Sequence, residues 1–276
     1  MKIKAKDINL YDTIFSGQCF RMTLEEDKSI TIVIKDRVIN IKKENDYLIV
    51  NSNKEDNLEK IVNEYLDLDR DYDKINYDLS SKSKILKDNI DLVKGYKILK
   101  QDEFEMFITY IISQNNRVSK ISRSVEKISM MYGEKVLFNN KEYYLFPTFE
   151  KLKNISLTHL KEAGVGFRDK YIKEALNYLE DNPNFLNDLK NISTNEAIDK
   201  LCLIKGIGLK VASCILLFGY SRFDCFPIDT WVKKFVSENF KIKDNMRDIS
   251  LYMKNTFDDY SGLAIQYFYH IERNKR

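Results

Sequence analysis

The chain has 276 residues, 43% of them hydrophobic and 32% charged, which is the composition of a globular protein with enough apolar residues for a large core. No run of about 18 apolar residues occurs and no signal peptide opens the chain, which excludes a membrane-spanning class, so we expect a cytoplasmic protein. The four cysteines show no C-x-x-C spacing, so we expect reduced thiols and no metal or iron–sulfur site.

Charge is unevenly distributed along the chain. The net charge is only +3, but residues 94–173 carry 15 basic and 9 acidic side chains, whereas residues 1–93 carry 16 and 19. A basic middle segment fits a protein with one face that follows the phosphates of a nucleic acid. Ordinary solvated helix faces would explain the same counts equally well.

The first 50 residues have the pattern of β-strands. Isoleucines alternate with other residues over 30–34, and apolar runs follow at 38–41 and 47–50 after polar turns. We therefore expect an antiparallel sheet within an N-terminal domain of residues 1–80. The segment S-G-Q-C-F-R, residues 16–21, lies in this region. Its glycine would let the backbone approach a ligand, although a β-bulge or hairpin glycine is the simpler alternative.

The rest of the chain, residues 81–276, has helical periodicity. Before it we expect one helix over 58–66 and a solvated acidic loop over 67–73. Further helices are expected over 86–92, from the N-cap Asp102 to about Ser113, and over 118–131. The predicted fold class is therefore α+β, an antiparallel sheet domain followed by mostly helical subdomains. No Pro/Gly-rich linker separates them, so they should pack closely.

Two junctions between the predicted helices have distinctive sequences. The first is S-Q-N-N at residues 113–116, and adjacent asparagines normally cap and turn the chain. The second is G-V-G-F-R at residues 164–168, just before a helix that contains Tyr171. A simple turn at a helix start would explain the second junction equally well.

A helix-hairpin-helix pattern spans about residues 194–219. Ser193 and Glu196 have the spacing of a capping box for a helix over about 194–203. Gly206 and Gly208 then permit a tight turn into a second helix that starts at Leu209. Backbone amides at the start of that helix suit a phosphate oxygen and would position DNA without reading its sequence. The same pattern also occurs at helix junctions that bind no nucleic acid.

Three residues near this hairpin could carry chemistry. Lys210 and Cys214 are four residues apart and therefore share one face of the second helix. A partly desolvated lysine amine deprotonates more easily, and the neutral amine is a nucleophile. Asp229 follows Pro227 at the N-cap of the helix that contains Trp231, where the helix dipole and free amides keep a carboxylate ionised. Taken singly, such residues are more often a solvated lysine and an ordinary cap.

The pattern L-x-G-x-G-x-K-x-x-x-C followed by P-x-D resembles the helix-hairpin-helix DNA glycosylases, and S-G-Q-x-F-R makes the chain similar to the 8-oxoguanine DNA glycosylases/AP lyases among them. The resemblance covers nearly the whole chain. It implies an N-terminal sheet domain like that of the TATA-binding protein, and a C-terminal helix that packs back on the active-site cleft. It also implies that Lys210 attacks the sugar C1′ and that Asp229 is the essential carboxylate. The chain departs from the family at Lys205, where proline is usual.

The resemblance also assigns residues to base recognition. In the family, the carbonyl at the position of Gly17 accepts the N7 hydrogen of 8-oxoguanine, a hydrogen that guanine lacks. Cys214 and Tyr269 would stack on the two faces of the base. The family's glutamine, which contacts the Watson–Crick edge, aligns with Ile265, and Gln266 lies one place later. Either Gln266 turns toward the base or recognition depends more on Gly17.

A second set of residues is implied to hold the DNA around the extruded base. Asn115 would fill the space that the base leaves, Phe167 would insert beside it, and Arg168 would contact the opposite cytosine. Eukaryotic relatives have a cytosine-reading arginine where this chain has Lys120, which cannot make the planar two-point contact, so we expect looser opposite-base selectivity. The remaining members of the DNA-binding set are Gly206, Gly208 and Trp231.

The implied activity is excision of 8-oxoguanine from duplex DNA through a Schiff base on Lys210, followed by a β-elimination that nicks the strand. We expect a monomer whose partner is duplex DNA and which needs no organic cofactor, although the hairpin carbonyls could hold a monovalent cation. Two alternatives stay open. A glycosylase of another base range would share the hairpin and Asp229, and a non-catalytic DNA-binding module would need neither Lys210 nor Asp229.

Overall fold

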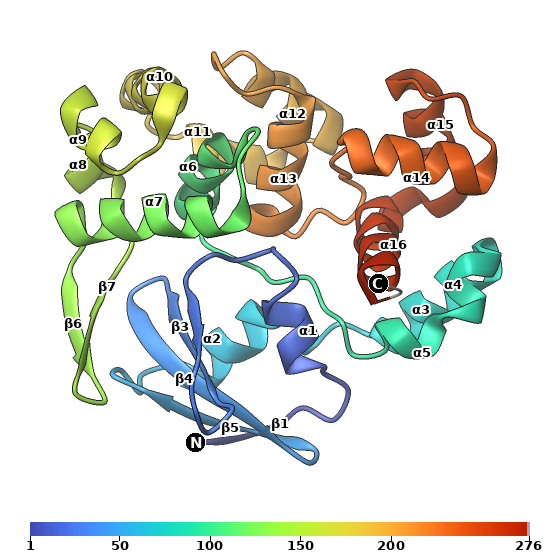
Figure 1. The fold of residues 1–276 in the computed structure, drawn as a ribbon, viewed down its shortest axis with the longest axis horizontal. Helices are drawn as coiled ribbons and strands as arrows, with labels where there is room; N and C mark the ends of the chain where they lie inside the picture. The colour runs from blue at the N-terminus through green and yellow to red at the C-terminus, as the bar shows by residue number, and fades with distance from the viewer. Residues whose placement is uncertain (275–276) are drawn as a thin grey trace.

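A computed structural model describes residues 1–274, and the first part of the chain forms a five-stranded antiparallel sheet in the order β1-β5-β4-β3-β2 (Figure 1). Ile32 pairs with Ile39, and Ile41 pairs with Val50. The predicted antiparallel sheet is confirmed. The strands of the chain are β1 (Lys2–Lys4), β2 (Met22–Leu24), β3 (Ile30–Ile34), β4 (Arg37–Glu44), β5 (Tyr47–Ser52), β6 (Lys135–Phe138) and β7 (Lys141–Tyr144).

The second part of the chain is helical and surrounds the larger of the hydrophobic cores. At its centre lies α13, in which residues 211–219 are all buried, and Phe218 stacks on Tyr110 of α6 with ring centroids 5.4 Å apart. The α-helices of the chain are α1 (Leu10–Ile14), α2 (Leu58–Tyr65), α3 (Tyr72–Lys82), α4 (Lys84–Asp88), α5 (Ile90–Val93), α6 (Glu103–Ser113), α7 (Val118–Tyr132), α8 (Phe149–Leu152), α9 (Leu157–Glu162), α10 (Asp169–Asp181), α11 (Phe185–Asp188), α12 (Thr194–Cys202), α13 (Leu209–Tyr220), α14 (Thr230–Phe240), α15 (Met246–Phe257) and α16 (Ser261–Asn274).

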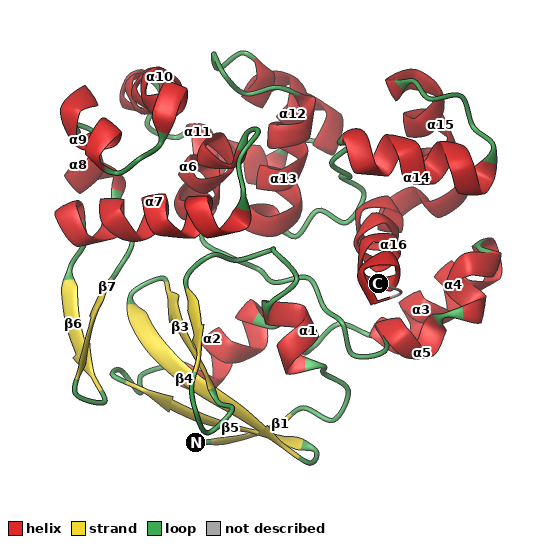
Figure 2. Cartoon of the chain, in the orientation of Figure 1, coloured by secondary structure: helices red, strands yellow, loops and turns green. Residues whose placement is uncertain are grey.

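Helices and a hairpin cover the sheet. A smaller core joins the sheet to α1 and α2, and Ile32, Ile41 and Val62 are almost fully buried in it. The hairpin of β6 and β7 extends from the helical part toward the sheet (Figure 2), where Phe138 packs against Val33. Because both faces of β3 are covered, all five of its residues are buried.

This β6–β7 hairpin corrects the expectation that the chain is helical throughout after residue 81. Its turn consists of Asn139 and Asn140, which both have positive φ angles of 50° and 59°. Two consecutive residues at positive φ are the geometry of a tight hairpin turn, and asparagine tolerates it. The paired asparagines between short apolar runs were therefore the sequence signal that was missed.

Two helix boundaries also differ from the prediction. The helix α3 starts within the acidic stretch 67–73, because the Asp71 side chain caps it by accepting a hydrogen bond from the Lys74 amide at 2.9 Å. The helix expected over 86–92 is interrupted at Asn89, whose side chain donates to the Ile85 carbonyl at 2.8 Å. Asparagine side chains compete in this way with the helical hydrogen bonds of the backbone.

The two parts of the chain are joined closely at the C-terminal helix. Figure 1 shows α16 returning from the helical part to end near α1. There Arg273 Nη1 donates to the Phe15 carbonyl at 2.8 Å, and His270 Nε2 lies 3.6 Å from Asp12 Oδ2. The last turns of α16 therefore tie the helical part to the segment that precedes Gly17.

Candidate active site

The predicted helix-hairpin-helix is formed by α12 and α13. Ser193 and Glu196 make the capping box that starts α12, with the Ser193 amide donating to the Glu196 carboxylate at 2.9 Å. In the turn, Gly206 has φ +91°, and a Cβ there would lie 2.4 Å from the ring of Tyr171 on α10, so only glycine fits. Gly208 is the N-cap of α13, and a Cβ there would meet nothing within 4 Å. The first amides of α13 therefore open onto free space, which suits a phosphate.

A cleft of about 590 Å³ lies beside this hairpin. Its walls come from α1 and the segment after it, the α6–α7 turn, the starts of α13 and α14, and α16. The structure thus brings together residues that are up to about 250 positions apart in the sequence. The residues predicted for the site that line this cleft are Gly17, Lys210, Cys214, Asp229, Trp231, Gln266 and Tyr269.

The amine and the thiol lie on one face of α13, as their spacing predicts. Lys210 is partly buried on the first turn, with its Nζ 5.9 Å from the ring centroid of Tyr110. Cys214 is one turn further on and is 3% exposed. Burial raises the pKa of the Cys214 thiol, and the nearby Lys210 amine opposes that rise. The thiol is therefore a neutral apolar surface at pH 7, and the role of Lys210 as the nucleophile stays a prediction.

The carboxylate is held by the start of α14. Asp229 Oδ1 accepts a hydrogen bond from the Val232 amide at 2.8 Å, which is the N-cap contact expected from the sequence. Pro227 and Ile228 just before it are buried and fix its approach, whereas Asp229 itself is exposed to the cleft. Asp229 and Lys210 therefore line the same cleft.

Aromatic side chains form another wall of the cleft. Tyr269 on α16 is 42% exposed and makes an edge contact with Trp231, with centroids 5.1 Å apart, and Trp231 stacks on Phe235. Ile265 is 2% exposed, whereas Gln266 is partly exposed, and both line the cleft. The cleft thus offers flat apolar surfaces with the Gln266 amide at the side, which suits a planar base.

The Gly17 segment is fastened by its neighbour Gln18. Gln18 Nε2 donates to the Lys97 carbonyl at 2.8 Å, its Oε1 accepts from the Leu99 amide at 2.8 Å, and its carbonyl accepts from Gln101 Nε2 at 2.8 Å. Gly17 has φ +95°, and within residues 1–274 its carbonyl has no hydrogen-bond partner. The segment is therefore rigid next to a carbonyl that is free to accept a hydrogen bond from a ligand.

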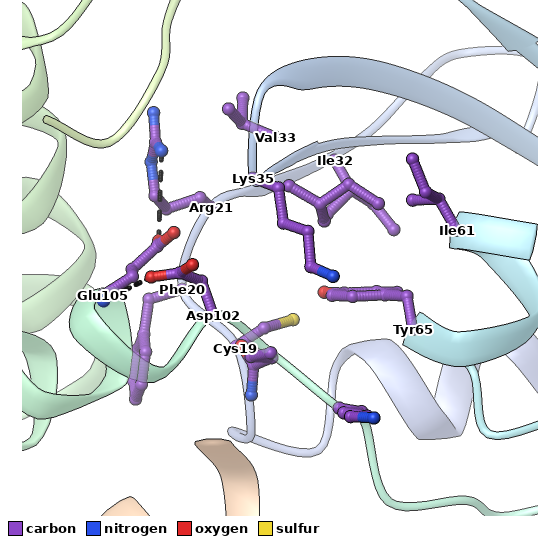
Figure 3. Close-up of a pocket in the computed structure, with 13 residues that line it drawn as sticks. Cys19, Phe20, Arg21, Ile32, Val33, Lys35, Ile61, Tyr65, Asp102 and Glu105 are labelled. Atoms are coloured by element: carbon purple, nitrogen blue, oxygen red, sulfur yellow. Dashed lines mark hydrogen bonds and ion pairs between the residues drawn. The ribbon is translucent and has the colours of Figure 1, made fainter. Parts of the chain in front are cut away.

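Behind this segment lies a narrow pocket between the sheet and the helical part. Figure 3 shows Arg21, Asp102 and Glu105 on one side of it and Tyr65 with Lys35 on the other. Arg21 Nη1 is 3.9 Å from Glu105 Oε1, and Arg21 Nη2 donates to the Tyr144 carbonyl. Burial raises the pKa of Glu105 to about 7, although the Arg21 charge opposes this. Arg21 therefore attaches the end of the Gly17 segment to α6 and to the β6–β7 hairpin.

The residues predicted to surround an extruded base lie outside the cleft lining, near its α6–α7 edge. Asn115, at φ +46°, and Lys120 are exposed, and the ring of Phe167 is 58% exposed. Arg168 differs, because it is only 3% exposed and its guanidinium donates to protein carbonyls. The predicted contact of Arg168 with the opposite cytosine stays a prediction.

Sequence reasoning missed three residues that shape the cleft. Gln18 lay within the recognised segment but was given no role, and its partners lie about 80 residues away in the sequence. Tyr110 was assigned no role, and its hydroxyl donates to the Gln18 carbonyl at 3.3 Å. Arg273 lies four residues after Tyr269 and thus on the same face of α16, a spacing that could have revealed it.

Neither a metal site nor a membrane span is found in the described part of the chain. Residues 1–274 contain no group of three or more His, Cys, Asp or Glu side chains that could hold a metal ion. Within the same residues, no helix has the length and apolar character needed to cross a bilayer. All four cysteines, which fall in this range, are free thiols.

Comparisons with known proteins agree with this architecture. A family model described as the 8-oxoguanine DNA glycosylase N-terminal domain matches residues 1–107. The N-glycosylase/DNA lyase OGG1 of Arabidopsis thaliana is 31% identical over 156 residues, which are 55% of this chain and 42% of that relative. The chain spans about half the length of the curated relatives it matches.

Solved structures match over the whole chain. A structure of MBOgg1 in complex with a low-affinity DNA ligand is 37% identical, with a TM-score of 0.93, and the match covers 99% of this chain and 95% of that one. The 8-oxoguanine glycosylase/lyase of Clostridium acetobutylicum in its apo form is 33% identical, with a TM-score of 0.91 and 98% of each chain covered. The same enzyme was also solved with duplex DNA that contains cytosine opposite 8-oxoguanine. The chain therefore belongs to the 8-oxoguanine DNA glycosylase/lyase family.

Proposed function

We propose that this protein excises 8-oxoguanine from duplex DNA, as the first step of base-excision repair in the cytoplasm, and then nicks the abasic strand. The observation that carries the proposal is the presence of Lys210, Asp229 and Gly17 on one cleft. An amine and a carboxylate on the same cleft supply the chemistry, and a free carbonyl next to flat apolar walls supplies the selection. No organic cofactor enters this chemistry.

Excision starts at the Lys210 amine. The neutral amine forms a bond to C1′ while the bond between C1′ and N9 breaks and the base leaves with a proton. Asp229 stabilises the positive charge that develops on the sugar. Opening of the sugar ring gives a Schiff base between Lys210 and C1′. Loss of a C2′ proton then expels the 3′ phosphate, which nicks the strand.

Base selection follows from the Gly17 carbonyl. The N7–H of 8-oxoguanine can donate to it, whereas guanine presents a lone pair at N7 and would leave the carbonyl unpaired and repelled. The base would lie between Cys214 and Tyr269, with Gln266 at its edge. Since Ile265 takes the place of the family's edge-reading glutamine, discrimination depends strongly on Gly17.

The DNA backbone would be held by the hairpin around Gly206 and Gly208, through the amides at the start of α13. Asn115 and Phe167 are exposed close to the cleft edge and would occupy the space that the base leaves. These contacts position the duplex, and the cleft then determines which base is removed.

The test is cleavage of a duplex oligonucleotide with one 8-oxoguanine by wild type, Lys210→Gln and Lys234→Gln. Lys234 is a matched control because it lies on α14 with its side chain 72% exposed. We expect strand cleavage by wild type and Lys234→Gln and none by Lys210→Gln. Full activity of Lys210→Gln would contradict the proposal. A panel of duplexes with alkylated or other oxidised bases tests the alternative. A glycosylase of another base range would excise one of those bases faster than 8-oxoguanine, whereas the proposed enzyme would not.

A further inference from the structure

Arg273 is a cation at the rim of the cleft that no step of the proposed excision uses. It lies one turn of α16 beyond Tyr269 and lines the same cleft as Gly17. Because Arg273 is exposed, its side chain lies at the open side of the cleft and not at its floor. Within the described chain, the cleft lining has two positively charged residues, Lys210 and Arg273. A second charge therefore faces any base that enters.

The guanidinium of Arg273 is held next to the Gly17 segment. Its Nη1 donates to the Phe15 carbonyl at 2.8 Å. Phe15 precedes Gly17 by two residues, so their Cα atoms are at most about 7.6 Å apart. A guanidinium has about five N–H donors, and residues 1–274 supply one hydrogen bond to this one. Most of its donors are therefore available near the Gly17 carbonyl.

The oxidised edge of 8-oxoguanine offers a matching pattern. The N7–H donor, which the Gly17 carbonyl would accept, lies between two acceptors, O8 and O6. C8 is bonded to N9, so O8 is at the sugar end of the base, whereas O6 is at the opposite end. A base that enters the cleft with its sugar at the opening presents O8 to the rim, where Arg273 lies. Guanine has a C–H group in place of O8.

The opposite edge of the base has fewer polar partners in this cleft. Ile265, which takes the place of the family's glutamine, is apolar and 2% exposed. Gln266 is partly exposed and supplies the nearby amide. An apolar wall cannot pair with the donors of the Watson–Crick edge, so that edge contributes less discrimination. More of the selection must then come from the edge that faces Gly17.

We propose that Arg273 is a specificity-determining residue that donates a hydrogen bond to O8 of 8-oxoguanine while the Gly17 carbonyl accepts from N7–H. Together the two groups read adjacent positions, and guanine differs from 8-oxoguanine at both. The proposal rests on the proposed function, since it concerns the same base in the same cleft. Loss of a hydrogen bond from a charged donor should weaken recognition by about 10–100-fold.

The first experiment measures binding without excision. The duplexes carry a 2′-fluoro nucleotide, which slows breakage of the bond between C1′ and N9, and contain 8-oxoguanine, guanine or a tetrahydrofuran abasic analogue. We expect Arg273→Leu to bind the 8-oxoguanine duplex about 10–100-fold more weakly than wild type and the other two within about 3-fold. Lys234→Leu, at an exposed lysine, should match wild type on all three. Equal weakening by Arg273→Leu on all three duplexes would overturn the proposal.

The second experiment changes the base instead of the protein. 8-Thioguanine keeps N7–H and O6 but replaces O8 by sulfur, which is a weak acceptor. Wild type should bind it more weakly than 8-oxoguanine, and Arg273→Leu should cost less than about 3-fold on it, because the contact is already lost. If Arg273 acted only by holding the Phe15 carbonyl, Arg273→Leu would cost the same factor on both bases. That result would contradict the contact with O8.

Arg273→Lys guards against a variant that fails to fold. Lysine keeps the charge and one donor group, so it should bind the 8-oxoguanine duplex at least about 3-fold more tightly than Arg273→Leu. The same gain on the guanine duplex would show general attraction of DNA and would contradict the proposal. If wild type did not prefer 8-oxoguanine to guanine, the proposed function would fail. If wild type showed the preference and Arg273→Leu kept all of it, only the role of Arg273 would fail.

Discussion

The two sides of the cleft are built in different ways. Lys210 and Asp229 are placed by features within a few residues, namely a glycine turn before α13 and an N-cap at α14. Gly17 is placed by Gln18, whose hydrogen-bond partners at 97–101 lie about 80 residues away in the sequence. The reacting side is thus set by local structure, and the recognising side by contacts between distant segments.

Reaction and recognition can therefore be disturbed separately. A change on the reacting side should slow excision and strand cleavage together, because both use the Lys210 amine in the proposed mechanism. A change on the recognising side should spare an abasic substrate, which has no base to recognise.

The largest effect is expected for Asp229→Asn. Asparagine can still accept the hydrogen bond from the Val232 amide, so the cap of α14 and the fold are kept. The negative charge is lost, and the rate should fall by about 10²–10³-fold on 8-oxoguanine and on abasic DNA, with DNA affinity little changed. Single-turnover kinetics measure this effect, with Asp224→Asn, a change at another exposed aspartate, as the control. If the rate of Asp229→Asn stayed within about 3-fold of wild type, Asp229 would have no part in the chemistry.

Gly17→Ala tests the recognising side. The φ of +95° is strained for alanine, and the added methyl would meet no protein atom within 4 Å, so the damage falls on the backbone and the cleft. We expect excision of 8-oxoguanine to fall by roughly 10²-fold while cleavage of a preformed abasic site changes by less than about 3-fold. Equal losses on both substrates would show that the two sides of the cleft are not separable.

Glu105 provides a test through pH. Burial raises its pKa to about 7 from the ordinary 4.5, so between these values the folded chain keeps a proton that the unfolded chain has lost. The free energy of unfolding should therefore fall by about 3 kcal/mol from this group as the pH rises from about 4.5 to 7. Urea melts of wild type, Glu105→Gln and the neighbouring Glu103→Gln measure this decline in the free energy of unfolding. Only Glu105→Gln should lack the decline. If Glu105→Gln declined as much as wild type, Glu105 would not be its source.

The smallest effect concerns Lys120, at the edge of the cleft. Because lysine cannot make the planar two-point contact with the cytosine edge, wild type should reject 8-oxoguanine opposite A, G and T less sharply than relatives with arginine at this position. Lys120→Arg should increase the preference for C by up to about 10-fold. A wild-type enzyme that already rejects the other three bases sharply would show that Lys120 does not set this preference.

Much of the reacting side could be predicted from the sequence because its determinants are short-range. The capping box of Ser193 and Glu196, the start of α13 and the cap at Asp229 were all placed where the structure has them. The role of Gln18 could not be predicted, because its partners at 97–101 are 79 to 83 residues away. The β6–β7 hairpin was missed because its strands are only four residues long and interrupt a helical region.

The covalent bond proposed between Lys210 and deoxyribose can be trapped by reduction. Borohydride is added during reaction with a duplex that contains 8-oxoguanine, and the reduced adduct is digested and located by mass spectrometry. We predict that the added mass falls on Lys210 and that Lys210→Gln gives no adduct. An adduct on another lysine, or active wild-type enzyme with no adduct at all, would contradict the account.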